Sequence, residues 1–462
     1  MRSIHFAIFN SLVAHNQQLQ ATKEGLAIDW EPAKDGLSIL IKLRRGVKFH
    51  DGTDFNAQAV KFNIERLQDP KMKSPQGGYA EPIAAVEVVD DYTVNFRLKR
   101  PSPALMETFG LQGGLIISPA AAKKYGDDFG RNPVGTGPFQ FVSWDRGGHV
   151  VLKRFDGYWG KDKDGNQLPY LDGMDFAIIP DSTVAFANLR TGSVDMFRDV
   201  AYSDLATLKQ NQGLTYSEEQ QTTLWGVYMN TSKPPFDNKA LRQAIALGID
   251  RAGIVKGVYG EGAAVVENYL IPLSWAYDPA YKYPFAGADV AKAKAKLAEA
   301  GYPQGLKVEF LGADRREDTL IAETIQQSLA KIGVTLDLKL INSAQRLDLM
   351  NTLQYSIGWS GYTIYADPEL SLTNRFHSTA GSRNRAGYKS PQVDALLDKA
   401  GSLYDQKERT SLYRQAGEII MDDAGFVPND VYRFVFGLSK KVKNFVQFYD
   451  GVERFTEVWL EK

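Results

Sequence analysis

One short stretch of the sequence carries most of the side chains that could bind a small molecule. The segment 359–368 reads WSGYTIYADP and places Trp359, Tyr362 and Tyr365 near the carboxylate of Asp367. Aromatic rings can stack on a ligand while polar groups orient it, so the segment is a candidate ligand wall. The same pattern suits the end of a strand packed by its own rings, with Asp367 as a helix cap. Both interpretations stay open.

Two pairs of arginines are the next candidates. Arg383 and Arg385 follow within the same loop system, and Arg315 and Arg316 stand just before a predicted helix. A guanidinium group matches a carboxylate through two parallel hydrogen bonds, which makes arginine suited to an acidic ligand. The alternative for each is a solvated surface position.

The five histidines show no spacing typical of a metal site. His5, His15, His50, His149 and His377 are scattered along the chain, and structural or solvated roles suit all of them. His377 stands out because it follows the aromatic, Asp-containing loop. We expect neither a metal site nor a catalytic residue.

Composition and missing motifs argue against several classes of protein. The 462 residues carry 54 Lys and Arg against 55 Asp and Glu, a balance that disfavours nucleic acid or an anionic membrane as the main partner. The absence of cysteine excludes disulfides, thiol nucleophiles and thiolate metal sites. The common phosphate-loop, dinucleotide-binding, zinc-protease and nucleophile-elbow motifs are missing, and no cofactor is implied.

Hydrophobic periodicity and cap residues predict a mixed α/β chain. Asn56 is a predicted helix cap, and a helix is expected over 290–300 before Gly301. Strands over 306–311 and 334–341 flank an amphipathic helix over 317–332, an order that predicts a parallel pair of strands. Long aromatic-rich connections between such elements usually carry binding function.

Four groups of segments follow one another in an order typical of a known family. They are LRRGVKFHDG (43–52) with AVKFN (59–63); PVGTGPF (133–139) with YW (158–159) and YLDG (170–173); NT (230–231) with PPFDN (234–238) and LRQA (241–244); and YKSPQVDALL (388–397). In this order they resemble the family 5 extracellular solute-binding proteins of ABC importers, the peptide, nickel and opine group. The matches span nearly the whole chain.

The resemblance implies a two-lobed α/β fold of the periplasmic-binding-protein type (type II, cluster C) with an extra inserted subdomain. Lobe I would comprise residues 1–24, 137–222 and 431–462, with an α+β subdomain over 25–136 inserted into it. Lobe II would cover 223–430, and the solute would be enclosed between the lobes. We also expect a periplasmic monomer whose signal peptide is absent from this chain, with the permease subunits of an ABC importer as its membrane partner.

The resemblance is weakest at the positions where the peptide-binding members of the family contact their ligand. In those proteins an aspartate a few residues after a Gly-Trp pair binds the amino group of the peptide. Here Gly358 and Trp359 are present, but the corresponding positions are Tyr362 or Ile364, and neither is acidic. An ammonium group buried without a carboxylate costs several kcal/mol. We therefore expect a solute modified at its amino end, or a shifted Asp367.

The other expected positions follow from the same resemblance. The arginine that holds the ligand carboxylate in dipeptide binders corresponds best to Arg315 or Arg316, and Trp225 and Asn10 fall on or near predicted crossing segments. The expected ligand-binding set is Trp359, Tyr362, Tyr365, Asp367, Arg383, Arg385, Arg315, Arg316, Trp225, Asn10 and His377.

These observations favour a binding protein that delivers a peptide-like or opine-like solute to a membrane permease. One alternative is a hydrolase of small peptides or glycosides that uses carboxylates such as Asp367 and Glu369. A second alternative is a carrier of nickel complexes, for which His377 is the only histidine near the expected site.

Overall fold

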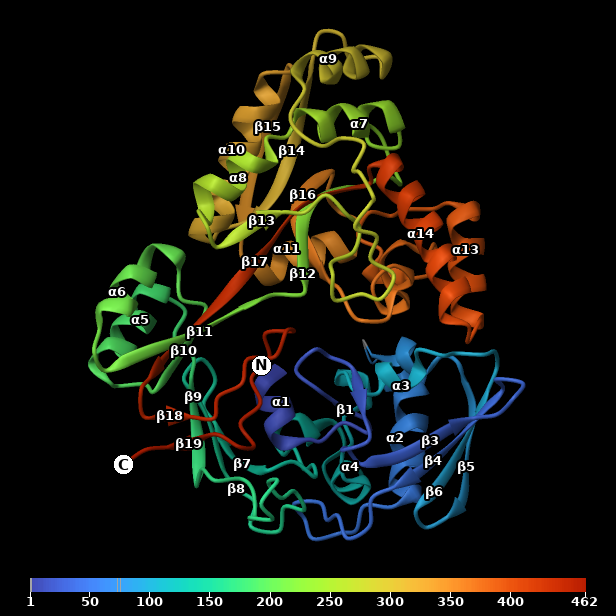
Figure 1. Cartoon of the computed structure of the whole chain (residues 1–462), viewed down its shortest axis with the longest axis vertical. Helices are drawn as coiled ribbons and strands as arrows, with labels where there is room; N and C mark the ends of the chain where they lie inside the picture. The colour runs from blue at the N-terminus through green and yellow to red at the C-terminus, as the bar shows by residue number, and fades with distance from the viewer. Residues whose placement is uncertain (1, 73, 75) are drawn as a thin grey trace. The chain divides into compact units, whose positions relative to one another are not determined.

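The computed structural model describes residues 2–72, 74 and 76–462, which fall into two compact units. Unit 1 comprises Met1–Glu219 and Phe434–Lys462, and unit 2 comprises Gln220–Arg433. The boundaries expected for lobe II, 223 and 430, lie close to the ends of unit 2. Both units combine helices with sheets, so the predicted mixed α/β class is confirmed (Figure 1).

A four-stranded antiparallel sheet forms one part of unit 1. Its order is β3 (Ala27–Pro32), β4 (Ser38–Leu43), β6 (Thr93–Leu98) and β5 (Ile83–Asp90). Helix α2 (Ala57–Gln68) packs against β5 and β6, and its first turn is capped by the side chain of Asn56, as predicted. This part of the unit has its own core, which includes Phe49, Phe96 and Phe109.

The remainder of unit 1 holds a three-stranded sheet of β7 (Phe139–Trp144), β8 (His149–Arg154) and β9 (Gly173–Ala177). Strand β10 (Met196–Arg198) pairs instead with the second half of β17 (Phe426–Ser439), a long strand that continues into unit 1 from unit 2. The other elements of the unit are α1 (Arg2–Ile8), β1 (Ala14–His15), β2 (Ala21–Thr22), α3 (Leu105–Thr108), α4 (Pro119–Tyr125), α5 (Ser182–Thr191), α6 (Leu205–Gln210), β11 (Leu214–Gln220), β18 (Val442–Lys443) and β19 (Trp459–Leu460).

The sheet of unit 2 has the order β17, β12 (Thr223–Met229), β16 (Ile357–Thr363), β14 (Leu306–Ala313) and β15 (Val334–Ile341). Strands β14 and β15 pair in parallel along their whole length and are connected by α10 (Arg316–Ala330), so the predicted parallel pair is confirmed. Strand β16 is parallel to β14, whereas β12 is antiparallel to both β16 and β17. The short β13 (Ala263–Val265) pairs with β17.

Helices surround this sheet in two packed pairs and several single elements. Helix α7 (Lys239–Gly248) packs on α9 (Val290–Glu299), and α13 (Pro391–Ser402) packs on α14 (Gln406–Asp423) (Figure 1). The others are α8 (Arg251–Val258), α11 (Ser343–Asn351) and α12 (Thr373–Phe376). One large hydrophobic core unites these helices with the sheet.

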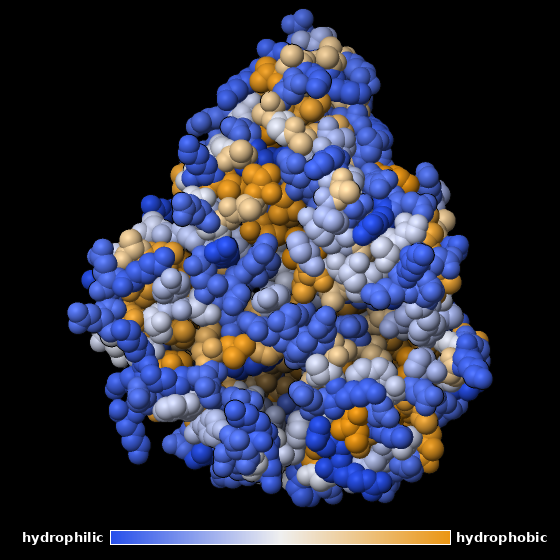
Figure 2. All heavy atoms as spheres, viewed as in Figure 1, coloured by the Kyte–Doolittle hydropathy of each residue, from blue (hydrophilic) through white to orange (hydrophobic). Residues whose placement is uncertain are grey.

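The surface agrees with the balanced composition. Hydrophilic side chains cover most of the face shown in Figure 2, and hydrophobic ones appear in separate areas. Within residues 2–72, 74 and 76–462, every helix is too short or too polar to span a membrane.

Two buried histidines should make the stability of unit 1 depend on pH. Nε2–H of His50 donates to Gly137 O at 2.9 Å, its Nδ1 accepts from Gly135 N–H at 3.4 Å, and burial lowers its pKa to about 4. Burial also lowers the pKa of His15 to about 4. Between pH 6.5 and 4 the unfolded chain binds protons that the folded ring does not, so stability falls as the pH decreases.

The expected loss is at most about 1.4 kcal/mol per pH unit for each histidine. Urea unfolding between pH 7 and pH 4 measures it, and His50→Gln should give a flatter profile than the wild type. Equal slopes for the two proteins would show that His50 is not one of the groups responsible.

Candidate functional site

One edge of the unit 2 sheet brings together several of the expected ligand-binding residues. The carboxyl ends of β14, β15 and β16 meet there because these strands are parallel. Strand β12 begins at the same edge, since Trp225 is paired with Gly361 near the end of β16, and β17 passes it where Asp430 is paired with Trp225. In open α/β sheets, ligands bind outside the carboxyl ends of the strands. We call this region the carboxyl edge.

Four rings form a row at the carboxyl edge, which we call the aromatic row. The rings of Trp359 and Trp225 lie 6.3 Å apart at 15°, Trp225 lies 6.3 Å from Tyr432, and Tyr432 stacks on Tyr259 at 5.3 Å and 6°. Trp359 is only 1% exposed and belongs to the core, whereas the other three rings are half-buried. The accessible part of the row is therefore Trp225, Tyr432 and Tyr259.

Two arginines approach the backbone of β16 at this edge. Arg385 donates from Nε to Asn351 Oδ1 at 3.0 Å and from Nη1 to Gly361 O at 2.9 Å and Ser360 Oγ at 3.1 Å. Arg346, on α11, donates from Nη1 to the carbonyl of Trp359. Burial lowers the pKa of Arg385 to about 10, and the nearby Arg346 and Arg375 act in the same direction. The group is rich in positive charge.

The other three predicted arginines are placed differently. Arg383 donates from Nη1 to Asn374 Oδ1 at 3.2 Å. Arg315 precedes the first residue of α10, Arg316, and both side chains are exposed. Arg315 Nε lies 4.0 Å from Oδ2 of Asp318.

The aromatic and acidic residues that follow Trp359 are largely held by the fold. The hydroxyl of Tyr362 is buried and donates to Tyr269 O at 2.8 Å. Tyr365 is half-buried, and its backbone N–H donates to Ser371 Oγ at 2.9 Å. Asp367 is 5% exposed, caps a 3-10 turn by accepting from Glu369 N–H at 2.9 Å, and lies 2.9 Å from Arg409 Nη1. Its carboxylate thus has a cap role and a cation of its own.

The last two predicted residues lie elsewhere. Oδ1 of Asn10, in unit 1, accepts from Thr136 Oγ1 and from Trp159 Nε1, each at 3.1 Å. His377 is buried, with Nε2 at 3.3 Å from Asp398 Oδ1. No three or more His, Cys, Asp or Glu side chains among the described residues are arranged to hold a metal ion.

Sequence reasoning missed Arg346, Asp430, Tyr432 and Tyr259 at the carboxyl edge. One signal was available for Asp430, because it is an acidic residue inside the long apolar stretch of β17. No sequence pattern indicated Arg346, because an arginine on an amphipathic helix is usually solvated. Its position follows only from the packing of α11 beside β14.

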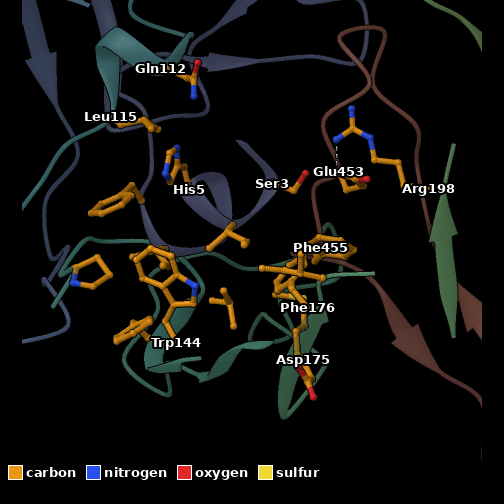
Figure 3. A pocket seen from close by; sticks show the side chains of 18 of the residues that line it. Ser3, His5, Gln112, Leu115, Trp144, Asp175, Phe176, Arg198, Glu453 and Phe455 are labelled. Carbon is orange, nitrogen blue, oxygen red and sulfur yellow. Dashed lines mark hydrogen bonds and ion pairs between the residues drawn. The ribbon is translucent and has the colours of Figure 1, made fainter. Parts of the chain in front are cut away.

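A separate cavity of about 1410 Å³ lies within unit 1. Figure 3 shows Trp144, Phe176 and Phe455 around it, with a polar side where Glu453 accepts from Ser3 Oγ and lies 3.7 Å from Arg198 Nη1. None of the described residues that line this cavity belongs to the expected ligand-binding set.

Comparison with known proteins gives the chain its family. The family model of the bacterial extracellular solute-binding proteins, family 5 (middle region), matches residues 21–383. This chain belongs to that family. The glutathione-binding protein GsiB of Shigella dysenteriae serotype 1 is 32% identical over 434 residues, which cover 92% of this chain and 83% of the relative. GsiB of Salmonella typhimurium strain LT2 is 33% identical over the same shares.

Solved structures give the same result for the fold. The periplasmic binding protein DppA of Helicobacter pylori, in complex with the peptide STSA, has a TM-score of 0.89 and 30% identity, covering 99% of this chain and 93% of that one. AgaA of A. tumefaciens R10, in complex with agropinic acid, has a TM-score of 0.90 and 28% identity, covering 100% and 94%.

The family assignment confirms the expected fold and function class. The chain has the periplasmic-binding-protein type of fold and is the solute-binding component of an ABC importer. The family and the relatives are substrate-binding transport proteins, so the hydrolase alternative is wrong. The nickel alternative stays a hypothesis, and the ligand-binding residues stay predictions.

Proposed function

We propose that this protein captures a small peptide-like or opine-like solute by its carboxylate group, with Arg385 and Arg346 as the carboxylate-binding residues at the carboxyl edge. The observation that carries the proposal is the side chain of Arg385. It is largely buried, and among the described residues it forms no ion pair. Its neighbours are two further arginines.

Electrostatics explains why this arrangement needs an anion. A buried charge is costly unless an opposite charge or several hydrogen bonds compensate it. Arg385 uses Nε and Nη1 on neutral oxygens, and its Nη2 makes no hydrogen bond to the described part of the chain. The acidic side chain that acts electrostatically on Arg346 is Asp318, and Asp318 itself forms an ion pair with Arg315. A ligand carboxylate would supply the missing negative charge.

The solutes of the relatives have the chemistry that this site would require. GsiB is a glutathione-binding protein, the DppA structure contains the peptide STSA, and the AgaA structure contains agropinic acid. Each of these ligands offers a carboxylate, and the half-buried ring of Trp225 at the carboxyl edge would cover an apolar part of the solute.

Replacing Arg385 should weaken binding strongly. We expect Arg385→Ala to lower affinity for a carboxylate ligand about 10- to 100-fold, because a charge-assisted hydrogen bond is lost and no other group replaces it. Isothermal titration calorimetry with glutathione, Ser-Thr-Ser-Ala and agropinic acid measures the change, after native mass spectrometry has shown whether a solute is retained on purification.

A matched control comes from the same loop. Arg383→Ala removes an equal charge from a side chain that already bonds Asn374, so we expect affinity within about twofold of wild type. Equal losses for both variants would point to general charge attraction and would contradict a specific role for Arg385. A wild-type protein that binds none of the three solutes would overturn the proposed function for this chemical class.

The family also suggests the setting in which the protein works. We infer a periplasmic protein that acts as a monomer and delivers its solute to the permease subunits of an ABC importer in the membrane. Analytical ultracentrifugation with and without solute tests the oligomeric state. A stable dimer under both conditions would contradict it.

A further inference from the structure

A β-bulge in β17 gives the carboxyl edge a second polar group. The pairing with β12 shifts between Trp225 and Gly226, which face Asp430 and Pro428, so Asn429 is an extra residue on its strand. A bulge of this kind re-aims side chains that would otherwise alternate between faces. Here it brings Asn429 Nδ2 within 2.7 Å of Asp430 Oδ1.

Two oxygen atoms of this pair have no hydrogen-bond partner in the described part of the chain. Asp430 is 0% exposed and Asn429 is 1% exposed, and neither Asp430 Oδ2 nor Asn429 Oδ1 accepts a hydrogen bond from the described residues. No lysine, arginine or histidine among those residues forms an ion pair with Asp430. Native proteins rarely leave a buried carboxylate without a cation, and such groups concentrate at functional sites.

Aromatic rings surround the carboxylate. Trp225 is directly opposite Asp430 on the neighbouring strand, and Tyr432 is two residues further along β17, so both point to the same face of the sheet as Asp430. Tyr259 stacks on Tyr432 and is close enough to Asp430 for the carboxylate to help raise the pKa of its hydroxyl, an effect due mainly to burial.

We propose that Asp430 and Asn429, enclosed by Trp225, Tyr432 and Tyr259, form the binding site for the cationic amino group of the solute. The inference deepens the proposed function and rests on it. An ammonium group has three N–H donors, and the two free acceptors are a carboxylate and an amide oxygen. The faces of tryptophan and tyrosine attract a cation as well.

The proposed site supplies a carboxylate in place of the aspartate that the resemblance leads one to expect after Trp359. The aspartate that reads the amino group in peptide-binding members of the family is replaced here by Tyr362 or Ile364. Tyr362 lies in the core, and Asp367 is held by Arg409. Among the described residues, Asp430 is therefore an acidic side chain at the carboxyl edge that is available for an ammonium group. Burial raises the pKa of Asp430 to about 7, and a bound cation would lower it again.

Access to the carboxylate depends on one ring. The indole Nε1 of Trp225 has no hydrogen-bond partner among the described residues, and the ring is held by packing against Trp359, Tyr432 and the core of unit 2. Because Asp430 is 0% exposed and Trp225 is directly opposite it, this half-buried ring would have to move for the solute to reach the carboxylate.

The test compares solutes with and without an amino cation. Glutathione and Ser-Thr-Ser-Ala are each titrated with the amino group free and N-acetylated, into the wild type and Asp430→Asn. We expect the variant to lose about 30-fold or more in affinity for the free-amino forms, because an uncharged amide cannot compensate an ammonium, and to bind the acetylated forms as the wild type does. Asparagine has nearly the shape of aspartate, and thermal unfolding should show no loss of stability.

A carboxylate on an exposed strand of the same sheet serves as the control. Asp337→Asn removes an equal charge from the exposed Asp337 of β15 and should leave all affinities unchanged. Equal binding of the free-amino solutes by wild type and Asp430→Asn would overturn the inference and leave the proposed function intact. A wild type that binds agropinic acid but neither glutathione nor Ser-Thr-Ser-Ala would also overturn the inference and leave the proposed function intact. Binding of no solute by the wild type overturns the proposed function itself.

Discussion

Replacing Arg409 by methionine is expected to destabilise unit 2 by about 3–5 kcal/mol. The guanidinium is almost fully buried and makes two contacts of 2.9 Å with the carboxylate of Asp367, while its Nε donates to Ala400 O at 3.0 Å. It also lies 5.0 Å from the ring of Trp275. Methionine fills a similar volume but leaves the Asp367 carboxylate buried without its cation, and this uncompensated charge is the source of the loss.

The pH dependence of the variant identifies the cause. Burial raises the pKa of Asp367, and Arg409 opposes that shift. Without Arg409 the folded-state pKa rises further above the unfolded value, so the carboxyl group is neutral at low pH and becomes a buried charge as the pH increases. The difference in unfolding free energy between wild type and variant should therefore grow as the pH increases above the pKa that the Asp367 carboxyl has in the unfolded chain.

Urea unfolding followed by tryptophan fluorescence measures this difference. Because the protein has two compact units, the transition has to be fitted with the units allowed to unfold separately. The double variant Arg409→Met with Asp367→Asn removes both charges and should recover much of the lost stability. A double variant as unstable as Arg409→Met alone would show that packing, rather than the unpaired charge, is responsible.

This ion pair also shows where sequence reasoning stops. The spacing around Asp367 allowed two roles, ligand contact or helix cap, and the structure places the carboxylate as a cap. Its partner Arg409 lies 42 residues away on α14, and no local pattern links the two positions. Pairs of this kind are set by tertiary packing, which a single sequence does not encode in periodicity or spacing.

Elements built from local contacts were predictable. The helix cap at Asn56 and the strand-helix-strand order from β14 to β15 follow from residues only a few positions apart. The strands that build the carboxyl edge were harder to see. Residues 426–439 form a single strand, β17, whose pairing partners β10, β11, β12 and β13 all lie more than 160 residues earlier in the chain.

The same distinction between local and long-range contacts applies to the residues of the candidate site. Arg385 and Trp225 were predicted from residue type and resemblance; both lie at the carboxyl edge, and their role in binding stays a prediction. Asp430 was not found, because its importance comes from a bulge and from the absence of a cation near it, and both are properties of strand pairing and packing. Trp359 was chosen for its residue type, but exposure separates it from Trp225, and this difference leads to the second large prediction.

Trp359→Ala should destabilise unit 2 by about 3–5 kcal/mol, whereas Trp225→Ala should act mainly on binding. The ring of Trp359 is 1% exposed within the main core of unit 2, so its removal leaves a cavity that rigid neighbours such as Val227, directly opposite on β12, fill only in part. The half-buried ring of Trp225 lies at the margin of that core, and we expect its loss to weaken solute binding by about 1–3 kcal/mol.

Urea unfolding and calorimetric titration of both variants separate these two roles. The two rings stack on each other, so the comparison removes the same residue type from either side of one contact, and only the surroundings differ. Stability within about 1 kcal/mol of wild type for Trp359→Ala, together with a large loss of affinity, would move Trp359 from the core to the binding surface. The expected result is the opposite: Trp359→Ala lowers stability and Trp225→Ala lowers affinity. Trp359 would then belong to the core of unit 2, and Trp225, Tyr432 and Tyr259 would belong to the binding surface.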